Sequence, residues 1–171
     1  MIELERTFLV KFLPPQVKEA RSKEMVDIYY PNSSAHPTIR LRKNGERYEL
    51  TKKEPIEGDT TRMLEQTIEL RKNEFDEFSK LSGRKLEKIR YYFPYDGLTA
   101  ELDVFQGDLK GLVLADFEFA SQKEKESFQM PVFCLAEVNH EERLAGGMLG
   151  GKKFEDIQGI LSKYEYEKIQ I

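Results

Sequence analysis

The sequence has few of the residues on which several protein classes depend. Its 171 residues include no tryptophan and a single cysteine. A single cysteine excludes an internal disulfide, and we therefore expect a reducing compartment, the cytoplasm. We expect neither a membrane partner nor a signal peptide, because the sequence contains no apolar run long enough for either. Positive and negative charges nearly cancel, to a net charge of −4, so a nucleic-acid partner is not expected.

What the sequence does have is a series of strand-like segments separated by turn signals. The length fits one domain over residues 1–171. Strands are predicted over 2–10, 36–42, 46–54, 64–70, 88–95, 98–105 and 112–120. Turn dipeptides occur at Asn44-Gly45, Gly58-Asp59, Asp96-Gly97 and Gly107-Asp108. Such a series predicts an antiparallel sheet or barrel.

Helices are predicted between some of these strands. The expected ranges are 14–26, 73–83, 121–129 and 152–164. The second has Asn73 as an expected cap and an apolar stripe that includes Phe75 and Phe78. The fold class is therefore α+β, with strands dominant.

The predicted strands carry like charges at positions i and i+2, with apolar residues between them. Glu3 and Glu5 in the first strand are an example. The acids of this pattern are Glu3, Glu5, Glu101, Asp103, Asp116 and Glu118, and the bases are Arg40, Arg42, Lys88 and Arg90. One interpretation is a half-exposed sheet with its charges in water. The other is a closed barrel in which the charged faces line a shared interior.

The Asn44-Gly45 dipeptide selects the lysine that shares the face of the two arginines. A two-residue type I′ loop would pair Lys43 with Glu46 and Arg40 with Glu49. Directly paired residues share a face, so Lys53, and not Lys52, is expected on the face of Arg40.

A lining with both acids and bases suits a polyanion bridged by a divalent metal. Clustered carboxylates fit Mg²⁺ or Mn²⁺, and clustered arginine and lysine fit phosphate. Phosphoryl transfer uses this combination. A lipocalin-like ligand barrel would instead need an apolar interior, so the charges argue against it.

Several segments resemble the CYTH, or triphosphate tunnel metalloenzyme, superfamily. The opening "IELERTFLV" is similar to its Glu-x-Glu-x-Lys motif, and "RLRKNGERYELTKK", "KIRYYF", "AELDVFQGDLKGLVLADFEF" and "EVNHEERL" follow in the family's order. The resemblance implies an antiparallel eight-stranded β-barrel, the tunnel, with flanking helices. It also implies a divalent-metal-dependent triphosphatase, with a triphosphate as the small-molecule substrate. A homodimer is left open.

The resemblance also implies roles for individual residues. The metal ligands that it implies are Glu3, Glu5, Glu65, Asp103, Asp116 and Glu118. The substrate-binding residues that it implies are Arg40, Arg42, Lys53, Lys88, Arg90 and Arg143. Lys53 is in addition the catalytic candidate, as a residue that orients the attacking water.

Three positions depart from the family pattern. Thr7 replaces the motif lysine, Thr67 replaces an acid, and Gly147 replaces a late lysine. Because Thr7 brings no positive charge, a non-catalytic polyphosphate- or nucleotide-binding module is one alternative to the hydrolase. An adenylyl cyclase of the same superfamily is another, although no motif here marks an adenine pocket.

Overall fold

The computed structural model describes residues 4–56 and 59–170, and for 55, 56 and 59–63 it describes the backbone alone. These residues gather into two compact units. The first unit comprises Met1–Lys23, Lys88–Leu144 and Lys152–Ile171, and the second comprises Glu24–Glu87 and Ala145–Gly151. The single domain over 1–171 stays a prediction. In the part of the chain that is described, no helix is both long and apolar enough to cross a membrane.

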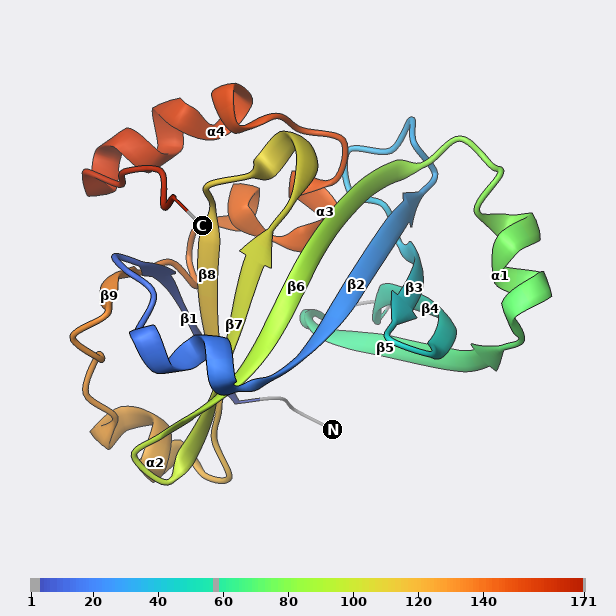
Figure 1. Ribbon diagram of the computed structural model, residues 1–171. Coiled ribbons are helices and arrows are strands. Elements are labelled where there is room, and N and C mark those ends of the chain that lie inside the picture. The colour runs from blue at the N-terminus through green and yellow to red at the C-terminus, as the bar shows by residue number, and fades with distance from the viewer. Residues whose placement is uncertain (1–3, 57–58, 171) are drawn as a thin grey trace. The chain divides into compact units, whose positions relative to one another are not determined.

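Strands dominate the described residues, as expected for an α+β chain (Figure 1). The strands are β1 (Glu5–Val10), β2 (Arg21–Tyr30), β3 (Ile39–Asn44), β4 (Arg47–Ile56), β5 (Asp59–Leu70), β6 (Arg84–Tyr95), β7 (Leu98–Phe105), β8 (Val113–Glu118) and β9 (Cys134–Glu137). The α-helices are α1 (Lys72–Phe78), α2 (Gln122–Ser127), α3 (Gly146–Leu149) and α4 (Phe154–Leu161). Short 3₁₀ helices are η1 (Pro15–Glu19), η2 (Gly107–Leu109), η3 (Glu142–Leu144) and η4 (Ser162–Tyr164).

The sheet of the first unit has the strand order β6-β7-β8-β1-β9, and its neighbouring strands pair in antiparallel fashion (Figure 1). Its apolar face carries alternate residues such as Phe8, Leu102 and Phe117, which are fully buried. The ring of Phe128, just after α2, packs on Phe117 with their centroids 4.6 Å apart. Because strand side chains alternate, the charged residues between these apolar ones are directed to the opposite face.

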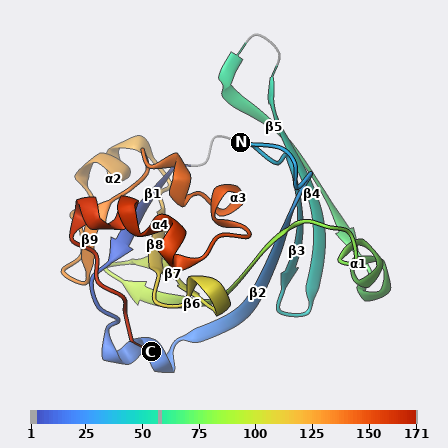
Figure 2. The ribbon, with the colours of Figure 1, turned by 90° about the horizontal axis from the view of Figure 1, so that it is seen from above.

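The sheet of the second unit has the order β5-β4-β3-β2 (Figure 2). Its apolar face packs on helix α1, where Leu41 and Phe75 are buried together with Ile28. Helices α1, α2 and α4 confirm the helices predicted over 73–83, 121–129 and 152–164, with shorter bounds. The predicted cap Asn73 is wrong, because α1 begins at Lys72 with Arg71 as its N-cap.

The barrel prediction is wrong for the residues described. The strands together have the order β5-β4-β3-β2-β6-β7-β8-β1-β9, in which β5 and β9 are the end strands. Nine strands are described where the family resemblance implied eight. The described residues therefore form an open antiparallel sheet. Closure depends on strand tilt and stagger, which the alternation along single strands does not encode.

The helix predicted over 14–26 is also wrong. Only the short η1 is helical there, and Arg21–Tyr30 form strand β2. Met25, Asp27 and Tyr29 are buried on one face of β2, and Ile28 is buried on the other. Burial on both faces hides the polar and apolar alternation by which a strand is recognised. The short edge strand β9 was missed as well.

The β3–β4 hairpin has the predicted faces but not the predicted register. Arg40 pairs with Thr51 instead of Glu49, because the loop residues are Gly45 and Glu46. Gly45 has a φ of 59°, whereas Glu46 does not have a positive φ. A glycine at the first loop position is the type II′ arrangement instead of type I′. A shift of two residues keeps side chains on their faces, so Lys53 still shares a face with Arg40.

Candidate active site

The first unit gathers charged side chains on one face of its sheet, here called the acid face. Its members are Glu5, Thr7, Lys88, Arg90, Glu101, Asp103, Asp116 and Glu118. The strand register brings them together, because Arg90 pairs with Asp103 and Asp116 lies between Glu101 and Thr7. The face thus carries five carboxylates and two cations.

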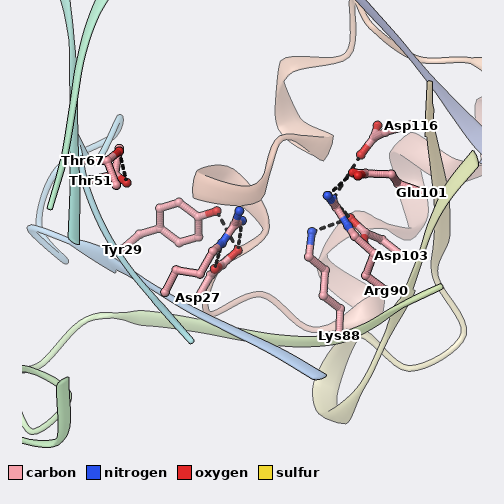
Figure 3. A network of polar contacts seen from close by, with 10 residues as sticks. Asp27, Tyr29, Thr51, Thr67, Lys88, Arg90, Glu101, Asp103 and Asp116 are labelled. Carbon is pink, nitrogen blue, oxygen red and sulfur yellow. Dashed lines mark hydrogen bonds and ion pairs between the residues drawn. The ribbon is translucent and has the colours of Figure 1, made fainter. Parts of the chain in front are cut away.

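Arg90 is the centre of the acid face (Figure 3). Its Nε and Nη2 donate to the two carboxylate oxygens of Asp103 at 2.6 and 2.7 Å. It also donates to Glu101, and its Nη2 lies 3.6 Å from the Asp116 carboxylate. A planar guanidinium suits such contacts, because its donors are held in a fixed fork.

Asp103 is the most buried carboxylate of the acid face, with 2% of its surface exposed. It also accepts a hydrogen bond from the Lys88 ammonium. Burial alone would raise the pKa of Asp103, but Lys88 and Arg90 outweigh it and lower the pKa below its usual range. Asp103 is therefore ionised and neutralised by its two neighbours.

Asp116 differs from Asp103 because its nearest donor is neutral. The Thr7 hydroxyl donates to Asp116 Oδ1 at 2.7 Å. Burial and the negative charge of Asp103 raise the pKa of Asp116 to about 6, although Thr7 and Arg90 act in the opposite direction. Burial likewise raises the pKa of Glu101. The acid face thus carries more negative charge than its own cations balance.

The side chain of Asn139 holds the backbone of β1 beside the acid face. Its Oδ1 accepts from the Thr7 N–H at 2.8 Å, and its Nδ2 donates to the Glu5 carbonyl at 3.3 Å. Strand β9 ends at Glu137, so the Asn139 amide makes the contacts that a longer strand would make. This arrangement fixes the segment from which the Glu5 carboxylate projects.

The second unit carries its own charged face, here called the basic face. Its members are Asp27, Tyr29, Arg40, Arg42, Arg47, Glu49, Thr51, Lys53, Glu65, Thr67 and Glu69. Arg42 donates from Nε and Nη2 to the two oxygens of Asp27 at 2.6 and 2.7 Å. Arg40 behaves differently, because its Nε is buried and has no hydrogen-bond partner among the described residues.

Tyr29 is buried on the basic face near Asp27. Its hydroxyl lies 3.4 Å from Asp27 Oδ2, and Figure 3 shows the two side chains together. Burial and the charge of Asp27 raise the pKa of Tyr29 well above its usual range, so the hydroxyl keeps its proton. Helix α3 approaches this ring closely, because a Cβ at Gly146 would lie 2.4 Å from the hydroxyl oxygen.

The outer part of the basic face is open to solvent. The Lys53 ammonium lies 3.5 Å from the Glu65 carboxylate, and both side chains are about half exposed. Next to them the hydroxyls of Thr51 and Thr67 are 2.9 Å apart (Figure 3). Thr67 therefore forms a neutral pair where an acid was expected from the family pattern.

Two predicted site residues, Arg143 and Glu3, are not among the described members of either charged face. Arg143 is exposed and pairs with Glu141 at 2.8 Å. Glu3 lies outside the described residues. Within the described residues no three histidine, cysteine, aspartate or glutamate side chains are already gathered around one point as metal ligands.

Two residues of the basic face were missed by sequence reasoning, namely Asp27 and Tyr29. Both lie in β2, just after the segment predicted as a helix. The alternation of Val26, Ile28 and Tyr30 with Met25, Asp27 and Tyr29 is the signal that could have revealed them.

The chain is similar to known proteins both in sequence and in fold. A model of the CYTH domain matches residues 1–130. The inorganic triphosphatase of Nitrosomonas europaea is 34% identical over 145 residues, which span 84% of this chain and 93% of that protein. The inorganic triphosphatase of Acetivibrio thermocellus is 38% identical over 58 residues, which span 34% of this chain and 36% of that protein. A crystal structure of an inorganic triphosphatase, 28% identical, superposes with a TM-score of 0.69 and covers 89% of this chain and 96% of that chain.

Proposed function

This chain belongs to the CYTH domain family, and on that premise we propose that it is a triphosphatase acting on inorganic triphosphate. The observation that carries the proposal is the similarity to the Nitrosomonas europaea inorganic triphosphatase over 93% of that protein's length. The charged faces of both units agree with a polyanionic substrate. The same relatives favour hydrolysis over the cyclase alternative.

The acid face fits a divalent cation by the chemistry of its donors. Five carboxylates face only two cations, and burial together with the negative charge of Asp103 raises the pKa values of Asp116 and Glu101. Hard cations such as Mg²⁺ and Mn²⁺ prefer oxygen ligands of this kind. The residues that would hold the ion are Glu3, Glu5, Asp116 and Glu118.

Two of the metal ligands implied by the family resemblance have other partners. Asp103 is neutralised by Lys88 and Arg90, and we assign it to holding these two cations in place. Glu65 pairs with Lys53 on the basic face. A bound divalent ion would supply positive charge that offsets the negative charge of the phosphate chain.

The chain's own cations would bind the phosphoryl oxygens. Arg40 is the first candidate, because its buried Nε has no hydrogen-bond partner among the described residues and an anion would provide one. Lys88 and Arg90 supply the positive charge of the acid face, where Thr7 contributes only a neutral hydroxyl. We keep Lys53 as the residue that orients the attacking water, since its ammonium is solvent-accessible. Arg143, which is exposed to solvent, would also bind the phosphoryl oxygens.

The experiment is a measurement of phosphate release from inorganic triphosphate, thiamine triphosphate and ATP, each with Mg²⁺ and with Mn²⁺. We expect release from inorganic triphosphate with a divalent ion and none in excess EDTA. Binding of triphosphate without any phosphate release under these conditions would reject the hydrolase in favour of the binding module. Release from ATP in preference to inorganic triphosphate would replace the substrate proposed here.

A further inference from the structure

The two arginines of β3 have the same position on the basic face but different neighbours. Arg40 lies between Tyr29 of β2 and Thr51 of β4, which both carry neutral hydroxyls. Arg42 lies between Asp27 of β2 and Glu49 of β4, which both carry carboxylates. The sequence pattern Arg-x-Arg treats the two residues alike, and the register separates them.

The contact between Asp27 and Arg42 is a buried, bidentate ion pair. Asp27 is 1% exposed, and the Arg42 side chain is 16% exposed. The two hydrogen bonds, at 2.6 and 2.7 Å, use the Nε and Nη2 donors of Arg42. A phosphate bound bidentately by arginine needs the same kind of donor pair. Asp27 therefore holds the donors that a substrate oxygen would otherwise take.

We propose that Asp27 is an internal competitor of the substrate, which occupies Arg42 and leaves Arg40 as the phosphate-binding arginine of β3. Asp27 would thereby set the affinity of the basic face for triphosphate. This inference rests on the proposed function, because it presumes that phosphate binds to the basic face. It also changes the role of Arg42 from a substrate ligand to the structural partner of a buried acid.

The first test is the isosteric variant Asp27→Asn, with triphosphate binding measured by calorimetry in excess EDTA. We expect about tenfold tighter binding, because the neutral amide no longer holds Arg42 as a charged partner does. Asp76→Asn is the matched control, since it removes one negative charge in the same unit but from helix α1, where Asp76 pairs with Lys72. The control should change the affinity less than about twofold, as expected for an exposed pair.

A second comparison separates competition from a structural effect of Asp27. The double variant Asp27→Asn/Arg42→Gln replaces the ion pair by two neutral amides and should bind triphosphate like the wild type. Arg40→Gln should lose about tenfold or more in affinity, because it removes a charge-assisted hydrogen bond to phosphate. The Asp27→Asn substitution should have no effect on binding when Arg42 is already glutamine.

The results that overturn the inference are distinct from those that overturn the proposed function. Unchanged or weaker binding by folded Asp27→Asn, as judged by circular dichroism, contradicts the inference. If Asp27→Asn does not fold, the double variant decides, and a loss as large as that of Arg40→Gln contradicts the inference. The proposed function fails separately, through the absence of metal-dependent phosphate release by the wild type.

Discussion

The acid face and the basic face begin from the same sequence pattern and end in different states. On the acid face β6, β7 and β8 carry like charges at i and i+2, and on the basic face β3 does. On the acid face both cations are engaged, because Lys88 and Arg90 are enclosed by Asp103, Glu101 and Asp116. On the basic face Arg42 is engaged by Asp27, whereas Arg40 has a buried Nε without a partner among the described residues.

This difference shows that the cross-strand neighbour decides what a charged side chain can do. A cation next to two carboxylates becomes part of the protein's own structure, as Arg90 does. A cation next to hydroxyls stays available to an anion, as Arg40 does. The acids follow the same rule, since Asp103 is neutralised and Asp116 has Thr7 as its hydrogen-bond donor.

The strongest expected effect is the loss of metal-dependent activity from the acid face. The variant Glu3→Gln/Glu5→Gln should lower phosphate release by more than about a hundredfold, because it removes two oxygen anions from the proposed metal site. Its thermal stability in EDTA should equal or exceed that of the wild type, since like charges are removed. Glu126→Gln in helix α2 is the control. Unchanged turnover in the double variant would mean that these acids do not hold the metal.

A second prediction compares buried Arg90 of the acid face with exposed Arg47 of the basic face. Arg90→Gln should cost about 3–5 kcal/mol in the free energy of unfolding, because it leaves Asp103 with Lys88 alone and removes the ion pairs of Glu101 and Asp116 with Arg90. Arg47→Gln should cost less than about 0.5 kcal/mol, because that side chain is exposed and lies 3.9 Å from Glu49. Urea denaturation of both variants in EDTA is the measurement. Equal losses would mean that the buried ion pairs of Arg90 contribute no more to stability than the exposed contact of Arg47.

The third prediction concerns pH and the Asp116 carboxyl. Its pKa of about 6 lies above the ordinary value of 3.8, so the folded metal-free protein binds this proton more tightly than the unfolded chain does. The contribution of Asp116 to stability should therefore fall as pH rises from about 4 to 6, by up to about 3 kcal/mol. Asp116→Asn should remove this decline.

The check on Asp116 is denaturation in EDTA at several pH values, together with the carboxyl carbon shift followed by NMR. A carboxyl that titrates near its ordinary value would contradict the prediction. The Asp116→Asn protein serves as the control, because it keeps a polar side chain that accepts the Thr7 hydrogen bond.

A fourth prediction tests whether Thr7 limits the acid face. Thr7→Lys should raise triphosphate hydrolysis by about tenfold, because an ammonium beside Asp116 adds a charge-assisted contact to phosphate. Turnover and the Michaelis constant are measured over a range of triphosphate concentrations, with Thr7→Val as the control for loss of the hydroxyl. Lower activity of Thr7→Lys would show that Lys88 and Arg90 already supply the needed charge.

The smallest expected effect comes from the side chain that supports β1. Asn139→Ala should weaken Mn²⁺ binding by a few fold, on the order of 1 kcal/mol, because two hydrogen bonds to the backbone of Glu5 and Thr7 are lost. Mn²⁺ binding is followed by electron paramagnetic resonance, and amide exchange at Thr7 should become faster. Faster exchange without weaker Mn²⁺ binding would mean that Asn139 supports the strand but not the metal site.

Much of the candidate site was predictable because strand alternation is local. The pairs Lys88 and Arg90, and Asp116 and Glu118, do lie on one face of their sheet. The choice of Lys53 over Lys52 is confirmed although the hairpin register differs by two residues, because an even shift preserves the face. The roles of the metal and substrate residues stay predictions.

The parts that could not be predicted depend on contacts between distant segments. The part of β2 up to Val26 was mistaken for a helix, because the burial of β2 on both faces comes from tertiary packing. Asp27 was therefore absent from the predicted site, and with it the partner of Arg42. A local feature was missed as well. The prediction placed a type I′ loop at Asn44-Gly45, which is a common sequence for that turn, whereas the structure has a type II′ loop at Gly45 and Glu46.

By itself the sequence determined which side chains share a face, because the period of two in a strand is a property of the local backbone. It also carried the family resemblance in the order of its motifs. Only the tertiary structure decided which charges meet, since Thr7 and Asp116 are 109 positions apart and come together through the register of β1 and β8. Register is set by packing across the whole sheet, and the same packing separates Arg40 from Arg42.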